Sequence, residues 1–192
     1  MLRPLALTAA CALAATTATA EGPQCEDWWV ARNLIFDRAG YCFSTPLGRA
    51  LFDNAGCTTT DPALTAEAAA TVAQIRSLET DYACAVDTTR TTLNDPGLLE
   101  LYRLFEDIPV RDIGESGCLG YRGDPLALRS GARADAPVTG WLQPGMSVGF
   151  AHFARGDYDF LMVFPSENSV EGVFGGWAII GPALLPCDGS AG

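Results

Sequence analysis

The stretch VTGWLQPGMSVGFAHFARGDYDFLMVF, residues 138–164, decides the fold of the second half of this 192-residue chain. Its apolar and aromatic runs are separated by Pro144-Gly145 and by Arg155-Gly156-Asp157, which are typical of turns. Short strands at this spacing predict a small antiparallel β-barrel. Five strands are expected, at 126–129, 138–142, 146–153, 158–164 and 174–180.

Glycine separates this region from the first half of the chain. Only five of the 20 glycines precede Ile108, and the other fifteen follow from Gly114 onward. Helix interiors exclude glycine, whereas tight turns between strands require it. The distribution predicts a helical first half and a β second half, which is an α+β fold.

The first half carries the start signals of four short helices. A capping side chain, in most cases followed by proline, marks each start. The longest helix has an apolar stripe from Ala68 to Tyr82. The start signals are Asp27, for a helix that runs to Arg38, then Thr45-Pro46, Asp61-Pro62 or Thr65, and Asp95-Pro96.

Residues 1–20 have the features of a signal peptide. Arg3 precedes an apolar run from Leu5 to Ala15, and Ala18-Thr19-Ala20 is a cleavage signal of small residues. The run is too short for a spanning helix, which needs about 20 strongly apolar residues, and no other segment reaches that length. We therefore expect a periplasmic or secreted protein, cleaved near Ala20, with no membrane span.

The mature chain keeps six cysteines, an even number that is typical of disulfides in an oxidising compartment. They can pair in 15 ways. No CxxC spacing supports a zinc or redox site, so all six are expected to be structural. Their positions relative to the expected helices and strands favour the pairs Cys25–Cys84, Cys42–Cys57 and Cys118–Cys187.

Charge and composition exclude several classes of protein. The chain has 23 acidic residues against 12 basic ones, all arginine, and a formal charge of −11. An acidic chain without a basic stripe is not expected to bind nucleic acid. A hydrophobic content of 48% argues against intrinsic disorder.

One sequence motif matches a catalytic motif of known enzymes, but the secondary structure expected around it differs from theirs. Residues Gly145 to Gly149 match the G-x-S-x-G pattern of serine hydrolases, which requires a strand before it, a helix after it, and an acid and a histidine downstream. Here Ser147 lies in an expected strand, and the only histidine, His152, falls on the opposite face of that strand. We therefore expect no catalytic residue and no cofactor. We also expect no metal site, because a metal needs several converging ligands.

Five side chains are candidates for contact with a ligand or partner. Arg32 lies among apolar residues of its helix and can bridge carboxylates inside the protein or bind an anion. Trp28 and Trp29 are about 100° apart on that helix, so we expect one of them, Trp29, to face an interface or a partner. The remaining three, which can line an aromatic groove, are Tyr121, Trp141 and Tyr158.

The second half resembles a bacterial Src-homology-3-like domain. The run Leu126–Gly131 is similar to its first strand, Val138–Gly145 to its diverging hairpin, and Gly176–Ile179 to its late strand. The resemblance covers about residues 120 to 182, with Leu128 where valine is usual. It implies a small barrel with a groove for extended or glycan-linked peptides.

The first half is similar to the YARHG domain of exported bacterial proteins. The matching runs are 30–36, 39–43 and 47–52. Ala31 and Arg32 match the motif, whereas Val30, Asn33 and Leu34 stand where Tyr, His and Gly would be. The whole chain resembles an exported alphaproteobacterial family of unknown function that shares the pattern beginning at Cys25.

These features together predict a domain order and a function. The order is a signal peptide (1–20), a disulfide-stapled helical YARHG-like domain (21–107), a Src-homology-3-like barrel (108–187) and a tail (188–192). The function expected is that of a non-enzymatic binding or interaction protein, with peptidoglycan or an envelope protein as partner. The alternatives are an inhibitor of a secreted protease or lysozyme, whose acidic surface would dock on a basic target, and a small hydrolase that uses Ser147.

Overall fold

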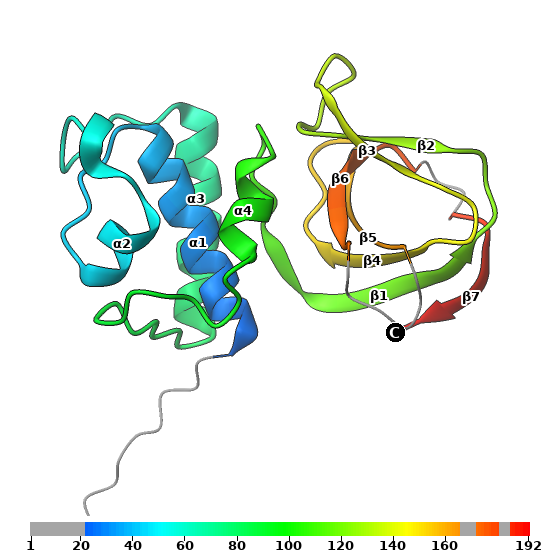
Figure 1. The fold of residues 1–192 in the computed structure, drawn as a ribbon, viewed down its shortest axis with the longest axis horizontal. Coiled ribbons are helices and arrows are strands. Elements are labelled where there is room, and N and C mark those ends of the chain that lie inside the picture. Colours follow the sequence, from blue (N-terminus) through cyan, green and yellow to red (C-terminus); the bar gives the residue numbers. More distant parts are fainter. Residues whose placement is uncertain (1–21, 166–171, 181–184) are drawn as a thin grey trace, which may run out of the picture.

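The computed structural model describes residues 22–165, 172–180 and 185–192, and the predicted signal peptide lies outside them. A helical lobe lies beside a curled sheet (Figure 1). The helices are α1 (Pro23–Arg38), α2 (Pro46–Leu51), the 3₁₀ turn η1 (Asn54–Gly56), α3 (Ala66–Asp81) and α4 (Leu98–Arg103). The strands are β1 (Arg111–Tyr121), β2 (Leu126–Arg129), β3 (Val138–Leu142), β4 (Ser147–His152), β5 (Asp159–Phe164), β6 (Phe174–Ala178) and β7 (Cys187–Ala191).

Two of the predicted helix starts are confirmed by their capping hydrogen bonds. Thr45 Oγ1 accepts from the Gly48 amide at 3.2 Å, and Thr65 Oγ1 accepts from the Ala68 amide at 3.2 Å. The start predicted at Asp27 is wrong, because α1 begins at Pro23 with Gly22 as its N-cap. Asp27 is therefore an interior helix residue, and its carboxylate is free to serve another purpose.

Helix α1 is the centre of the helical lobe and is buried on almost every side. Both tryptophans are consequently inside: Trp28 is 0% exposed and Trp29 7%. Trp28 faces the sheet, whereas Trp29 packs against Phe52 with ring centroids 6.1 Å apart. The expectation that Trp29 would face a partner is wrong, because its side chain is buried in the core of the helical lobe.

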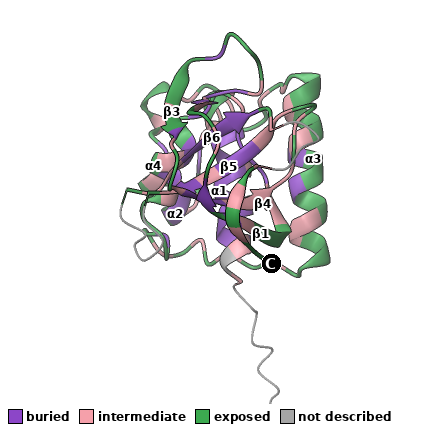
Figure 2. Cartoon of the chain, turned by 90° about the vertical axis from the view of Figure 1, so that its right-hand side faces the viewer, coloured by how far each residue is buried: buried purple, intermediate pink, exposed green. Residues whose placement is uncertain are grey.

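The sheet has seven antiparallel strands in the order β3-β2-β6-β5-β4-β1-β7. Its two ends, β3 and β7, do not pair with each other, so the predicted closed barrel is wrong. The sheet curls but remains open, and its strand order gives no confirmation of a Src-homology-3-like domain. Figure 2 shows buried residues along β5 and β6 in the middle of the sheet and exposed residues along β3 at its edge.

All five strands predicted from turn spacing are present, and two further strands were missed. Strand β1 is 11 residues long, holds three glycines and lacks an alternating burial pattern, so its sequence carries no period-2 signal. Residues 188–192 were expected to be a tail. Most of them form β7, which pairs with β1 and is made of small and polar residues.

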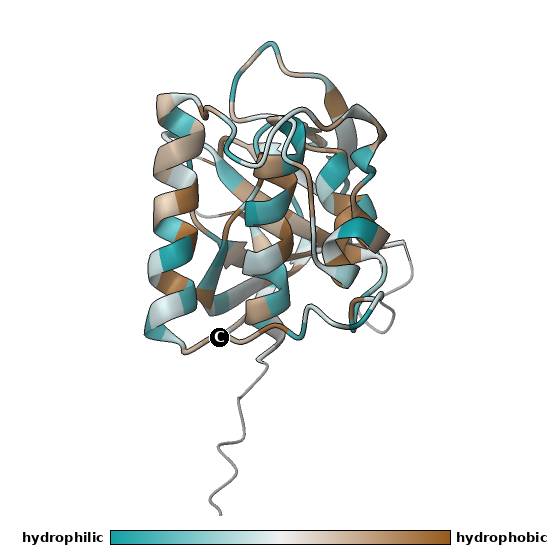
Figure 3. Ribbon diagram, turned by 90° about the vertical axis from the view of Figure 1, so that its left-hand side faces the viewer, coloured by the Kyte–Doolittle hydropathy of each residue, from teal (hydrophilic) through white to brown (hydrophobic). Residues whose placement is uncertain are grey.

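The two lobes are packed directly against each other. The connection after α4 buries Phe105, whose ring meets Phe160 edge-on at 4.8 Å, and Phe160 in turn meets Trp177. Trp28 Nε1 donates to the carbonyl oxygen of Arg111 at 2.8 Å. Figure 3 shows the helical lobe from its outer side, where hydrophilic and hydrophobic residues are interspersed. Trp28 of α1 and Phe105, which follows α4, therefore contribute contacts at the joint.

Three disulfides hold the described chain, and they are the three pairs expected from the sequence: Cys25–Cys84, Cys42–Cys57 and Cys118–Cys187. The first two lie in the helical lobe, and the third joins β1 to β7. None of the helices in the described segments has the length and apolar character needed to cross a membrane.

Candidate functional site

A hollow of about 450 Å³ lies between the helical lobe and the sheet. We call it the interlobe hollow. It combines charged, polar and apolar side chains from five parts of the chain. Its lining consists of Glu26, Asp27, Asn94, Asp95, Leu98, Leu101, Tyr102, Arg111, His152 and Met162.

Four polar side chains from four elements meet at the inner wall of this hollow. Asp27 comes from the first half of α1, Tyr102 from α4, Arg111 from the first position of β1 and His152 from the last position of β4. Arg111 and His152 are cross-strand partners in the β1–β4 ladder, so their side chains are neighbours on one face of the sheet. The end of that ladder faces the helices, which brings all four groups together.

Hydrogen bonds connect these groups in a chain. The Tyr102 hydroxyl donates to Asp27 Oδ1, and Tyr102 Oη lies 3.2 Å from His152 Nε2. Arg111 approaches the other carboxylate oxygen, with Nη1 3.8 Å from Asp27 Oδ2. Asp27 is 5% exposed and Tyr102 1%, so this chain is shielded from water.

Burial changes the protonation behaviour of the site. It raises the pKa of Asp27 from 3.8 to about 6, against the effects of the Tyr102 hydrogen bond and the Arg111 charge, while the negative charge of Asp95 adds to the rise. Burial also raises the pKa of the Tyr102 hydroxyl well above 10, helped by the adjacent Asp27. Burial lowers the pKa of His152 from 6.5 to about 3, and the positive charge of Arg111 acts in the same direction. At neutral pH, Asp27 is therefore mostly ionised, and Tyr102 and His152 are neutral.

The hydrogen-bond chain determines which nitrogen of His152 carries the proton. An ionised carboxylate only accepts, so the single hydroxyl hydrogen of Tyr102 is used on Asp27. Tyr102 Oη can then only accept from His152, which places the imidazole proton on Nε2. Nδ1 of His152 is left as a bare acceptor. It is buried and has no protein partner among the described residues.

Arg111 also has one nitrogen that it does not use. Its Nη2 pairs with Glu115 and its Nη1 lies near Asp27, whereas the buried Nε has no protein partner in the described chain. Glu26, by contrast, is fully used: it pairs with Arg90 and accepts the Asn94 amide at 2.9 and 3.0 Å. Two neighbouring residues that line the interlobe hollow thus keep one buried donor and one buried acceptor without a partner among the described residues.

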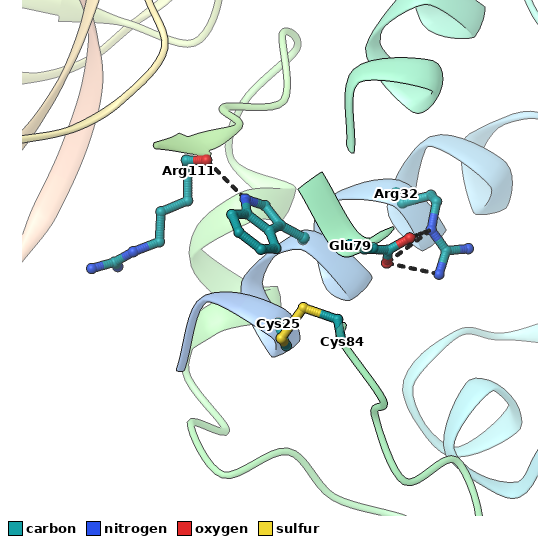
Figure 4. Close-up of a disulfide and its surroundings, with 6 residues drawn as sticks. Cys25, Arg32, Glu79, Cys84 and Arg111 are labelled. Atoms are coloured by element: carbon teal, nitrogen blue, oxygen red, sulfur yellow. Dashed lines mark hydrogen bonds and ion pairs between the residues drawn. A yellow bond between two sulfur atoms is a disulfide. The ribbon is translucent and has the colours of Figure 1, made fainter. Parts of the chain in front are cut away.

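The candidate contact residues named from the sequence lie elsewhere. Arg32 forms a bidentate pair with Glu79 inside the helical lobe, shown in Figure 4 beside the Cys25–Cys84 disulfide. Tyr121 is buried in the sheet core, and Tyr158 packs near Phe105 and Trp177.

Trp141, on the edge strand β3, is the exposed member of the set, with 48% of its surface accessible. Since Tyr121 and Tyr158 belong to different hydrophobic clusters, the structure does not bring the three aromatic side chains into one groove.

The hydrolase alternative has no support in this geometry. Ser147 is 5% exposed, and its Oγ accepts from the Gly120 amide at 3.3 Å. Ser147 and His152 are the first and last residues of β4, so they are roughly 17 Å apart along the strand. Within the described segments, no three His, Cys, Asp or Glu side chains lie close enough to hold a metal ion.

Sequence reasoning named none of the four members of this site as a site residue. His152 was considered only as an isolated strand residue, because its partners are far away in the sequence. Asp27 did carry a signal, since an acidic residue directly before two tryptophans in an apolar helix must be buried with a partner. Tyr102 and Arg111 carried none, because only the packing of the lobes brings them to Asp27.

Comparison with known proteins gives families for both parts of the chain. Residues 4–80 match the YARHG domain, in agreement with the resemblance seen in the sequence. No curated protein and no solved structure matched the chain. Residues 83–192, more than half of the chain, match a domain of unknown function, DUF4453. The chain belongs to the DUF4453 family and carries a YARHG domain before that region.

Proposed function

We propose that this protein is a non-enzymatic binding protein of the cell envelope and that the interlobe hollow is its binding site. The observation that carries the proposal is the pair of unused polar atoms, His152 Nδ1 and Arg111 Nε, on adjacent residues of the hollow. A buried polar group without a partner costs about 1–3 kcal/mol. A ligand that supplies both partners recovers this cost, which favours binding.

The protonation states support binding more than catalysis. A general acid or base works best when its pKa is near the working pH. The pKa of His152 is about 3, and that of Tyr102 is raised well above 10, so neither exchanges protons readily near neutral pH. Asp27 has a pKa of about 6, but its oxygens face Tyr102 and Arg111 and are committed to them. These groups order the site and hold its polarity fixed.

Three disulfides and the YARHG match support a location outside the cytoplasm. The signal-peptide features of residues 1–20 support the same location, with cleavage near Ala20. We therefore propose that the partner belongs to the periplasm or the cell surface and is either peptidoglycan or another envelope protein.

Site-specific photo-crosslinking in the native periplasm tests this proposal. A photoreactive residue at Leu98, which lines the hollow, is compared with one at the exposed Arg122, far away on the sheet. Purified protein is also sedimented with isolated peptidoglycan. A product that forms from position 98 and not from position 122, or co-sedimentation with peptidoglycan, supports the proposal.

The proposal would be overturned if no crosslinked product forms from position 98 and the protein does not sediment with peptidoglycan. Turnover of an ester or amide substrate that disappears in Ser147→Ala would replace it with the hydrolase alternative.

A further inference from the structure

We propose that the interlobe hollow binds an amino acid unit, that is, a free ammonium group next to a carbonyl or carboxylate oxygen. The inference rests on the proposed function in that it takes the same hollow as the binding site. It adds the chemical class of the ligand and the role of each side chain that would recognise it.

The acceptor is His152 Nδ1, a buried atom of a residue that lines the hollow. The chain from Asp27 through Tyr102 to His152 Nε2 leaves the lone pair of Nδ1 free, buried and without a protein partner in the described chain. Since the ring is neutral at neutral pH, Nδ1 accepts a hydrogen bond and cannot donate one. It therefore selects a ligand with an N–H or O–H group at this position.

The donor beside it is Arg111 Nε. Cross-strand pairing places the Arg111 and His152 side chains side by side, and Nε is the nitrogen of Arg111 without a protein partner among the described residues. A ligand that satisfies both atoms presents one donor and one acceptor. The ammonium and the oxygen of an amino acid unit have this arrangement, whereas a simple amine or a simple carboxylate has half of it.

The net negative charge of the side chains that line the hollow favours a ligand with an ammonium group over a ligand with only anionic groups. Glu26 is neutralised by Arg90, and Arg111 is shared between Glu115 and Asp27. The carboxylates of Asp27 and Asp95 therefore outweigh the cations that line the hollow. The repulsion between these two carboxylates contributes to the raised pKa of Asp27, and a ligand cation would relieve it.

The remaining wall is apolar and accepts a short carbon chain. Leu98 and Leu101 of α4 and Met162 of β5 line this side of the hollow. A volume of about 450 Å³ is in the lower range for small-molecule sites. The hollow therefore suits one small amino acid unit, either free or at the end of a cell-wall peptide.

The hydrogen-bond chain makes binding dependent on pH. When Asp27 becomes protonated, it can donate to Tyr102, Tyr102 can donate to His152 Nε2, and the proton of the ring moves to Nδ1. Nδ1 then repels the ammonium N–H, and the negative charge of Asp27 is lost as well. Because the pKa of Asp27 is about 6, binding weakens as the pH falls below that value.

Tyr102, Arg111 and Asp95 act on Asp27 directly, and the other charged or titratable groups in or beside the hollow are bound to these residues or to one another. Together these groups are Glu26 on α1, Arg90 and Asp95 in the segment before α4, Tyr102 on α4, Arg111 and Glu115 on β1, and His152 on β4. Asp27 and His152 are the two whose pKa values are moved to about 6 and about 3. Of these two, only Asp27 changes protonation between about pH 5 and pH 7.

Because the chain has one histidine, its imidazole nitrogen signals identify this site without assignment. Protein that is uniformly labelled with ¹⁵N is titrated with L-alanine, D-alanine, propylamine and propionate, and in a separate arm with a soluble cell-wall peptide. We expect an alanine to shift the Nδ1 signal and to bind at least tenfold more tightly than propylamine or propionate. The cell-wall peptide arm distinguishes a free amino acid from a cell-wall source.

Two variants and one control complete the experiment. His152→Phe and Arg111→Met should each weaken alanine binding at least tenfold, whereas Asp157→Asn, on the exposed β4–β5 turn, should leave it unchanged. Binding should weaken by up to about tenfold between about pH 7 and pH 5, given one controlling proton on Asp27. The titration of wild-type protein decides the question even if a variant fails to fold.

The inference is overturned if propionate binds as tightly as alanine, or if no probe moves the Nδ1 signal, in which case the hollow holds only water. If the photo-crosslink from position 98 persists while all amino acid probes fail, the inference is wrong and the proposed function stands. If both fail, the proposed function is wrong as well.

Discussion

Helix α1 carries two polar centres, and the structure completes one of them and leaves the other open. The paired centre is Arg32 with Glu79 of α3: Arg32 Nε lies 2.9 Å from Glu79 Oε2, and Nη2 lies 3.0 Å from Oε1. The side chains are 20% and 17% exposed, so the pair is mostly inside the lobe. It joins two helices of the same lobe.

The open centre consists of Asp27, Tyr102, Arg111 and His152. It lies about one and a half turns earlier on α1 and joins four elements across the two lobes. Each of its groups has a partner, but one donor and one acceptor nitrogen are left over. Such leftover atoms are few, because buried polar groups are usually satisfied; the others among the described residues are Arg90 Nε and Ser130 Oγ.

The difference shows how a buried polar cluster that only holds the fold together, here called a tie, can be distinguished from a buried polar binding site. The Arg32–Glu79 tie leaves no buried side-chain nitrogen or oxygen without a partner. A site keeps some groups unused and adds a hollow in front of them, as the open centre does. Four measurements can break or sharpen this distinction.

The largest effect on stability is expected from removing the Cys25–Cys84 disulfide, which lies close in sequence to both centres. Cys25 lies two residues before Asp27, and Cys84 lies five residues after Glu79. Figure 4 shows the Cys25–Cys84 disulfide near the Arg32–Glu79 pair. In the double variant Cys25→Ala/Cys84→Ala, a loop of 59 residues is no longer closed, so the free energy of unfolding should fall by about 4 kcal/mol. Urea denaturation followed by far-UV circular dichroism measures this loss.

A matched control is Cys118→Ala/Cys187→Ala, which opens a loop of 69 residues in the sheet lobe. It should cost a similar amount but leave the imidazole signal of His152 in place. A change of that signal in the control but not in the Cys25 variant would contradict the idea that the open centre depends on the N-terminal turn of α1.

The second effect is the pH dependence of the free energy of unfolding, which should differ between the two centres. The folded state raises the pKa of Asp27 to about 6 and lowers that of His152 to about 3. Between about pH 4 and pH 6, folding takes up a proton at Asp27 and releases one at His152. Stability due to Asp27 therefore falls as the pH rises, whereas stability due to His152 increases, and the two slopes largely cancel in the wild type.

Single variants should reveal each slope. Relative to the wild type, the free energy of unfolding of Asp27→Asn should increase by about 2 kcal/mol from pH 4 to pH 6. That of His152→Gln should decrease by about as much. Denaturation curves at several pH values measure both, with Trp141→Phe, a change at an exposed residue that does not titrate, as a control that should follow the wild-type slope. Parallel profiles for all four proteins would mean that the open centre does not titrate in this way.

The third effect tests whether the paired centre is only a tie. Arg32→Met or Glu79→Leu alone leaves a mostly buried charge without its partner and should cost about 2 kcal/mol. The double variant removes both charges and should recover most of that loss. A double-mutant cycle in urea measures the coupling. If the double variant loses envelope crosslinking while it stays folded, Arg32 has a binding role beyond the tie.

Local sequence signals predicted most of the secondary structure. The caps at Thr45 and Thr65 and the turn at Pro144-Gly145 act within a few residues, so they can be read from the chain. Strand β1 could not be predicted, because its pairing with β4 and β7 holds it extended in spite of its glycines. The open sheet likewise depends on which strands become neighbours, and no short pattern encodes that.

The candidate site could hardly be predicted from the sequence, because its residues are also brought together only by tertiary packing. Asp27 and Tyr102 are 75 residues apart, and Tyr102 and His152 are 50 apart. Aromatic residues drew attention because they often mark binding surfaces, but here Trp29 and Tyr121 fill the cores. In an acidic protein with one histidine, the buried partners of that histidine were the informative feature, and only tertiary packing shows them.

The smallest effect comes from an ion pair of the same chemistry in a different environment. Arg122 and Asp188 join β1 to β7 with Nε and Oδ1 2.8 Å apart, but their side chains are 61% and 65% exposed. Water and salt screen such a pair, so Asp188→Asn should change the free energy of unfolding by less than about 0.5 kcal/mol. Glu79→Gln makes the same chemical change in the paired centre and should cost at least about 1 kcal/mol. Urea curves for both, at low and high salt, measure the contrast. Equal costs would show that burial does not distinguish the two pairs, and the paired centre would then lose its role as the reference for the open one.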